Sequence, residues 1–105
     1  MTSLPLAGLL ALSATLLGVG LFGILTRRNF ILLLIAIEVA INAAILNFVI
    51  FSAYTPGLAG ASGQAAAVVI VGLAATEVAV GLAIVLALNR QRGTINVAEA
   101  SSLKL

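Results

Sequence analysis

The stretch from Asn29 to Phe51, NFILLLIAIEVAINAAILNFVIF, constrains this chain more than any other feature. Its 23 residues are almost all apolar, and it carries a single charge, Glu38. A helix of that length rises about 33 Å, enough to cross the hydrocarbon core of a bilayer. Such a helix has no polar face to present to water, so its solvent is lipid. A carboxyl group at that depth is costly, at about 2.5–3.5 kcal/mol for an Asp on insertion scales, so Glu38 is a candidate functional residue.

The composition agrees with a membrane protein and excludes several kinds of site. The chain is 63% hydrophobic and 8% charged, whereas ordinary globular proteins are about 25% charged. It has no Cys and no His, so it cannot ligate an iron–sulfur cluster, a histidine-bound haem or a thiolate zinc ion. Five basic residues without interleaved aromatic residues argue against a nucleic-acid partner. Any chemistry must come from carboxylates, amides, hydroxyls or arginines.

Three apolar runs predict an all-α integral membrane protein with three transmembrane helices in an antiparallel bundle. We expect one membrane domain over residues 1–105, with helices at about 4–25, 30–51 and 63–88. A loop at 26–29, an uncharged outer loop at 52–62 and a tail at 89–105 complete the chain. The first loop is short enough to force an antiparallel hairpin, and Pro56 with nearby glycines marks the second.

The basic residues predict the orientation. With three spans, the loop at 26–29 and the tail at 89–105 fall on the same side, and together they hold all five Lys and Arg residues. The positive-inside rule places that side in the cytoplasm, with the N-terminus outside and the C-terminus cytoplasmic.

A second membrane glutamate, Glu77, is expected at nearly the depth of the first. Glu38 is eight residues into the second span and Glu77 is eleven residues from the end of the third, which gives depths of about 12 and 17 Å in a core about 30 Å thick. Lipid disfavours the charged form of a carboxyl group, and a second carboxylate nearby disfavours it further. Two such groups can act as a proton relay, or each can stay protonated and simply hydrogen-bond a neighbouring helix. Asn42 lies one turn beyond Glu38 and is a possible hydrogen-bond partner for it.

Two segments resemble a known family: GLFGILTRRNFILLLIAIEVAIN (Gly20 to Asn42) and GQAAAVVIVGLAATEVAVGLAI (Gly63 to Ile84). They are similar to the small K subunit, also called 4L, of respiratory complex I. This family serves proton-pumping NADH–quinone oxidoreductases and their ferredoxin-using photosynthetic relatives. An Arg-Arg-Asn loop, a Glu with an Asn one turn later, and Ala-x-Glu-Val-Ala-Val-Gly-Leu-Ala make up the resemblance. One departure is Ile45, where the family commonly has a second Asn, so one polar group on the second helix is missing.

The resemblance implies roles for particular residues. Glu38 and Glu77 would belong to a buried proton-conducting axis, and Arg27, Arg28 and Asn29 to a cytoplasmic loop tied to activity. The chain would hold no redox centre or cofactor, because quinone, flavin and iron–sulfur clusters belong elsewhere in the complex. Its partners would be J-type and N-type membrane subunits and the lipid bilayer, in a prokaryotic plasma membrane or a thylakoid membrane.

Two other interpretations remain open at this stage. A stand-alone small proton-coupled transporter or antiporter component also uses an intramembrane glutamate, although small multidrug pumps usually have four spans and aromatic residues around it. A purely structural membrane subunit would leave both glutamates permanently protonated.

Overall fold

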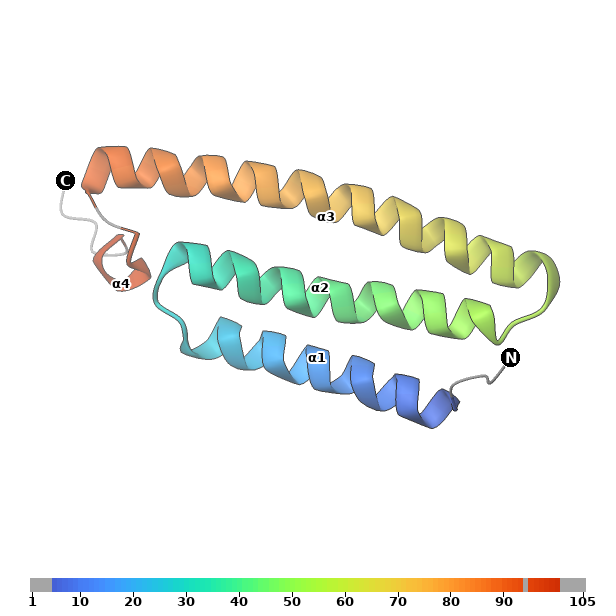
Figure 1. Ribbon diagram of the computed structural model, residues 1–105. Helices are drawn as coiled ribbons and strands as arrows, with labels where there is room; N and C mark the ends of the chain where they lie inside the picture. The colour runs from blue at the N-terminus through green and yellow to red at the C-terminus, as the bar shows by residue number, and fades with distance from the viewer. Residues whose placement is uncertain (1–4, 94, 101–105) are drawn as a thin grey trace.

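The computed structural model describes residues 5–93 and 95–100, and it is all-helical in its regular structure. Three long antiparallel helices, α1 (Leu6–Thr26), α2 (Phe30–Ala53) and α3 (Gly57–Arg92), are followed by one short turn, α4 (Val97–Ala100) (Figure 1). Each long helix is long and apolar enough to cross a membrane. The predicted all-α, three-span membrane fold is therefore confirmed. The predicted start of the first helix at residue 4 lies outside the described residues.

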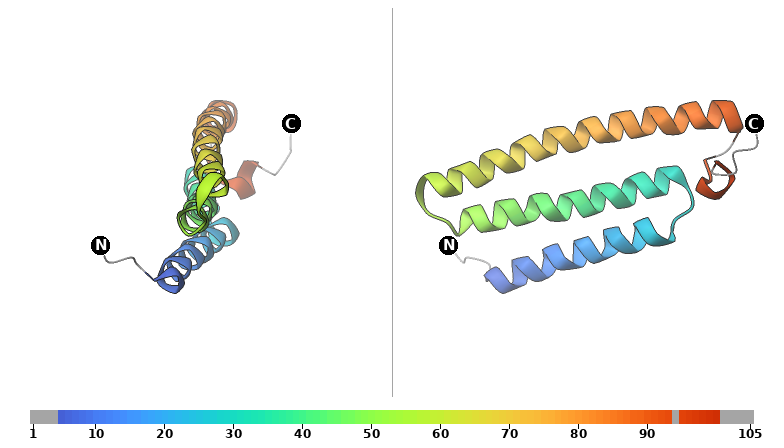
Figure 2. Two further views of the ribbon diagram at one scale, coloured as in Figure 1. Left: turned by 90° about the vertical axis from the view of Figure 1, so that its right-hand side faces the viewer. Right: turned by 180° about the vertical axis from the view of Figure 1, so that it is seen from behind.

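The helices form an open row with α2 in the middle. Both α1 and α3 pack along α2, and the views in Figures 1 and 2 agree that the three helices stack in one line. The molecule measures 58 × 23 × 20 Å. A row of this kind has two broad faces that no other part of the described chain covers.

The turn between α2 and α3 is shorter than the sequence predicted. Only Tyr54 to Pro56 separate the two helices, so most of the expected outer loop at 52–62 is helical. The glycines of this segment permit close contact instead of breaking the helix. A Cβ at Gly60 would collide with the Thr55 carbonyl oxygen, and one at Gly63 would lie 2.6 Å from the Ser52 Cβ.

The far end of α3 extends beyond the apolar run. The sequence placed the end of this helix near residue 88, but the structure continues it to Arg92. Gly93 then ends the helix in the left-handed conformation, with φ of 68°, and its N–H donates to the Asn89 carbonyl at 2.8 Å. Glycine adopts that conformation without strain, and Arg90 and Arg92 in the last turn complement the negative end of the helix dipole.

Buried residues at seven-residue spacing, all but one of them small, form the contacts between the helices. Buried positions that repeat every seven residues place one stripe of each helix against its neighbour, as in coiled-coil packing. These positions are Ser13 and Gly20 in α1, Ala36, Ala43 and Ile50 in α2, and Gly60, Ala67 and Ala74 in α3. Because lipid gives helices no hydrophobic reason to associate, such close packing is what holds them together.

Candidate functional site

The packing register sets the two membrane glutamates at the same level. Leu34 of α2 faces Gly81 of α3, with only 2.6 Å between the Leu34 Cδ2 and an ideal Cβ at Gly81, and Ser52 faces Gly63 in the same register. Glu38 is four residues after Leu34, and Glu77 is four residues before Gly81. Because the helices are antiparallel, both steps run in the same direction along the row. The two carboxyl groups are thus level with each other on neighbouring helices.

Glu77 emerges on the face of the row that contains a groove of about 170 Å³ between α2 and α3. Ile84 of α3 lines this groove together with Leu33 and Ile37 of α2. Seven residues separate Glu77 from Ile84, which is nearly two complete helical turns, so both lie on the same side of α3. Glu77 is exposed in this chain.

Glu38 emerges on the opposite face. At 100° per residue it is turned about 40° from Leu34, which faces α3, and in the sense away from Ile37 and Leu33, from which it is about 100° and 140° distant. It is only about 60° from Ile35, which lines a different groove of about 310 Å³ between α1 and α2. The structure therefore places one carboxyl group on each broad face of the row.

Neither carboxyl group has a partner within the described part of the chain. Glu38 is half-buried and Glu77 is exposed, and within residues 5–93 and 95–100 neither makes a hydrogen bond or ion pair. Asn42 is also exposed, and no hydrogen bond joins it to Glu38 there. This chain alone does not bury the two glutamates.

The loop between α1 and α2 consists of Arg27, Arg28 and Asn29. Both arginine side chains are exposed. Asn29 caps α2, since its Oδ1 accepts hydrogen bonds from the backbone N–H groups of Ile31 and Leu32 at 2.9 and 3.3 Å. The N-terminal amides of a helix lack partners within the helix, so this cap defines where α2 begins.

The tail returns to this loop, which sequence analysis missed. Asn96 forms an isolated antiparallel bridge with Asn29, and its side-chain Oδ1 accepts a hydrogen bond from the Ala98 N–H at 2.9 Å at the start of α4. The signal was present in the sequence as Asn96 three residues before Glu99, the spacing of a helix N-terminus.

A polar contact between α1 and α2 was also missed. Ser13 is only 2% exposed, and its hydroxyl donates to the Asn47 Oδ1 at 2.7 Å and is 3.1 Å from the Ala43 carbonyl. A serine in mid-span can equally bond its own helix, as Thr15 does at 2.8 Å to the Ala11 carbonyl. Spacing alone does not distinguish the two cases.

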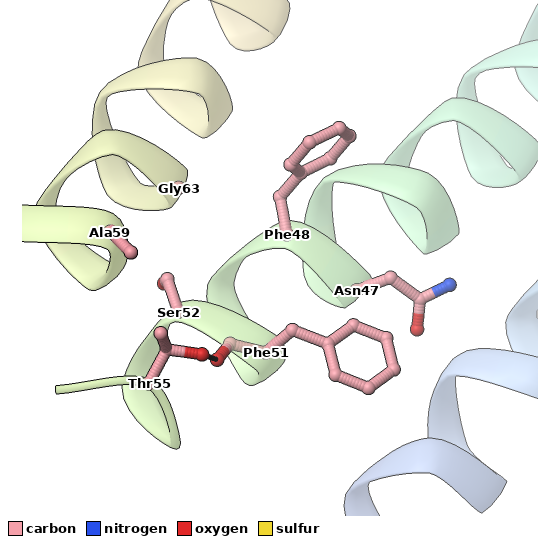
Figure 3. A pocket seen from close by; sticks show the side chains of 7 residues that line it. All are labelled: Asn47, Phe48, Phe51, Ser52, Thr55, Ala59 and Gly63. Carbon is pink, nitrogen blue, oxygen red and sulfur yellow. Dashed lines mark hydrogen bonds between the residues drawn. The ribbon is translucent and has the colours of Figure 1, made fainter.

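A pocket of about 330 Å³ opens beside the turn between α2 and α3 (Figure 3). Its lining combines apolar side chains with one amide and two hydroxyls, and the Thr55 hydroxyl is already bonded to the Phe51 carbonyl at 2.7 Å. The lining residues are Asn47, Phe48, Phe51, Ser52, Thr55, Ala59 and Gly63. None of these groups exchanges protons near neutral pH, so the pocket offers no acid–base chemistry.

The fold and the site together define a multi-pass membrane protein. Within the apolar part of its three spans, its only ionisable groups are two carboxyl groups, which lie at the same depth and on opposite faces of the row. The described residues hold no cluster of His, Cys, Asp and Glu that could bind a metal ion.

Comparison with known proteins identifies the family. A family model described as NADH-ubiquinone/plastoquinone oxidoreductase chain 4L matches residues 8–105. The chain is 44% identical to the NADH-quinone oxidoreductase subunit K of Geobacillus sp. (strain WCH70), covering 99% of both chains. It is 44% identical to the subunit K of Anaeromyxobacter sp. (strain K), over 95% of this chain and 98% of that relative. It is 42% identical to the subunit K of Desulfitobacterium hafniense (strain DSM 10664 / DCB-2), over 97% of this chain and 96% of that relative. The chain belongs to the chain 4L, or subunit K, family, as the resemblance predicted.

Proposed function

We propose that this chain is a membrane-arm subunit of a proton-pumping NADH–quinone or ferredoxin–quinone oxidoreductase, and that Glu38 and Glu77 form one step of its proton-translocation axis. The family membership supports the complex, in which quinone, flavin and iron–sulfur clusters belong to other subunits. The observation that supports the relay is the placement of the two carboxyls, level with each other and one on each face.

This arrangement suits a link between two neighbouring subunits. A carboxyl that faces lipid without a partner is costly, so each face needs a protein neighbour that offers polar groups or water. J-type and N-type subunits are the neighbours we propose, one for each face. A change of charge in the subunit on one face then acts, through the nearer glutamate, on the carboxyl group that lies on the other face.

The coupling between the two glutamates is strong enough to matter. With helix axes 8–10 Å apart, carboxyls on opposite sides of one helix pair lie about 10 Å from each other. Two unit charges at about 10 Å interact by about 1–2 kcal/mol at an effective dielectric constant of 20. In this proposal, a change of charge on one glutamate therefore acts electrostatically on the other.

The other predicted site residues take supporting roles in this proposal. Asn42 shares the face of Glu38 and is available to a water molecule or a neighbouring subunit that also contacts the carboxyl. Arg27 and Arg28 lie at the proposed cytoplasmic end, with Asn29 fixing the start of α2 beneath them.

Glu38→Gln and Glu77→Gln test the relay in membrane vesicles. Proton pumping is normalised to the amount of assembled complex and to the electron-transfer rate. Glu99→Gln is the matched control, because it makes the same change at the only other acidic residue, outside the spans. We expect each membrane variant to assemble but to lose most pumping and to slow quinone reduction, while the control pumps normally. Full pumping by Glu38→Gln would refute its role.

The stand-alone transporter makes a different prediction. The purified chain in liposomes should then exchange protons for a cation without any other subunit. We expect no such exchange, because this chain alone leaves its carboxyls uncovered.

A further inference from the structure

The tail of the chain forms a clasp with the loop between α1 and α2. After Gly93, residues 95–97 run antiparallel to residues 28–30, and α4 follows beside that loop (Figure 1). Two backbone hydrogen bonds join the segments. The Phe30 N–H donates to the Ile95 carbonyl at 2.8 Å, and the Val97 N–H donates to the Arg28 carbonyl at 2.6 Å.

The clasp completes the N-terminal cap of α2. Phe30 is the first residue of α2, and the N–H groups of a first helical turn have no acceptor inside the helix. Asn29 supplies acceptors for the next two N–H groups through its own side chain. Among the described residues, the partner of the Phe30 N–H is the Ile95 carbonyl of the tail, so the start of α2 and the tail form one hydrogen-bonded unit.

The clasp also fixes the backbone on both sides of Asn29. One hydrogen bond fixes the Arg28 carbonyl and the other fixes the Phe30 amide. The loop is only three residues long, and its arginines are adjacent in sequence. The two hydrogen bonds therefore restrict the loop on both sides of Asn29.

We propose that residues 95–97 are a positioning element that holds the Arg27–Arg28 loop in its working conformation, so that turnover of the assembled complex depends on the clasp. The effect on turnover rests on the function proposed above, whereas the clasp itself rests on the contacts alone. Neither Ile95 nor Val97 is a catalytic residue in this proposal, because both act through the loop.

Val97→Pro removes one clasp hydrogen bond with little other change. Val97 is the first residue of α4, a position where proline fits because its φ is already suitable and no N–H is needed within the helix. Asn96, which precedes it, takes part in an extended bridge that a following proline also favours. Val97→Ala is the matched control, because it trims the side chain and keeps the N–H. Loss of one hydrogen bond lowers the ratio of closed to open clasp by about two- to tenfold.

A disulfide provides a second, independent measurement. The two hydrogen bonds flank the pair of Asn29 and Asn96, which makes it a non-hydrogen-bonded pair with Cα atoms about 4.5 Å apart, within the range for a disulfide. The chain has no Cys of its own, so a disulfide within the Asn29→Cys, Asn96→Cys variant can form only at this contact. Both substitutions also remove capping side chains, so the reduced form of the same variant is the reference for the oxidised form. The double variant is oxidised in membranes that contain the assembled complex, and activity is compared in the same sample before and after reduction.

We expect the disulfide to form in the assembled complex, Val97→Pro to lower turnover per assembled complex, by at most the roughly two- to tenfold change in the clasp ratio, and Val97→Ala to leave it unchanged. In a Val97→Pro background carrying both cysteines, oxidation should restore turnover and dithiothreitol should reverse the gain. A purely structural tail would instead lower the amount of complex and leave turnover per complex intact, which overturns the proposal. Absence of the disulfide, or equal losses in the proline and alanine variants, overturns it as well.

Failure of the relay is distinguishable from failure of the clasp. If Glu38→Gln pumps normally while the disulfide forms and Val97→Pro slows turnover, the role of the clasp is supported and the proton relay is refuted.

Discussion

Gly20 provides the sharpest test of the packing between α1 and α2. An ideal Cβ at this position would lie 2.7 Å from the Ala40 backbone nitrogen and 2.9 Å from the Ala40 Cα. Ordinary contact begins at 3.4 Å, so the shortfall is 3.4 − 2.7, or 0.7 Å. Backbone atoms cannot rotate aside as the end of a side chain can, and Gly20→Ala must therefore push the two helices apart.

The cost follows from the contacts that this separation loses. A radial gap of about 0.5–1 Å forfeits a quarter to a half of the dispersion attraction between facing atoms, and overpacking of a well-packed contact typically costs about 1–3 kcal/mol. We expect Gly20→Ala to destabilise the α1–α2 hairpin by that amount. Gly18→Ala is the control, because nothing lies within 4 Å of its ideal Cβ.

The assay is an SDS titration of the purified chain in mixed micelles, followed by energy transfer between two dyes. Cysteines at Ala7 and Ala53 carry the dyes, since both positions are exposed and the antiparallel register brings these helix ends together. The chain has no other cysteine. Gly20→Ala should lose energy transfer at a lower SDS fraction than the parent, and Gly18→Ala at the same fraction. If the two glycine variants separate at the same SDS fraction, the reasoning from close approach is refuted.

Three further predictions concern the polar contact, the turn and the orientation. Ser13→Ala should destabilise the hairpin by about 0.6–2 kcal/mol in the same titration. Thr15→Ala should have no effect, because the Thr15 hydroxyl bonds its own helix. An equal loss in both variants would contradict a stabilising hydrogen bond from Ser13 to α2. Gly60→Ala should disturb the turn before α3, because its Cβ collides with a backbone carbonyl, and the amount of assembled complex should fall, whereas Gly72→Ala, with open space around it, should assemble normally. A cysteine at Gln91 should react with an impermeant thiol reagent only from the cytoplasmic side, and labelling from outside would reverse the predicted topology.

Much of the fold could be predicted because lipid imposes simple rules. A run of about 20 apolar residues is long enough to span the membrane. This rule locates all three long helices from the sequence alone. The common depth of Glu38 and Glu77 also followed from counting residues, and the packing register agrees with it.

The differences arise where tertiary contact decides the local structure. The glycines after Pro56 were interpreted as loop residues because glycine favours turns, yet at Gly60 and Gly63 α3 approaches the turn and α2 too closely for a side chain. The clasp of Asn96 on Asn29 pairs residues 67 positions apart, which no local pattern specifies. The face on which each glutamate emerges depends on how α2 is rotated between its two neighbours, and the sequence of one helix does not fix that rotation.

The open row has a consequence for the life of the chain in the cell. In each predicted span, between 11 and 17% of the residues in the most apolar window are buried within the chain itself, so most of its surface awaits lipid or other subunits. Stability that comes from partners depends on their concentration. A copy made in excess has two uncovered carboxyls and little interior of its own, and we expect membrane proteases to remove it. The amount of this subunit would then follow the amount of its neighbours, so that stoichiometry is set after synthesis by degradation of unassembled copies.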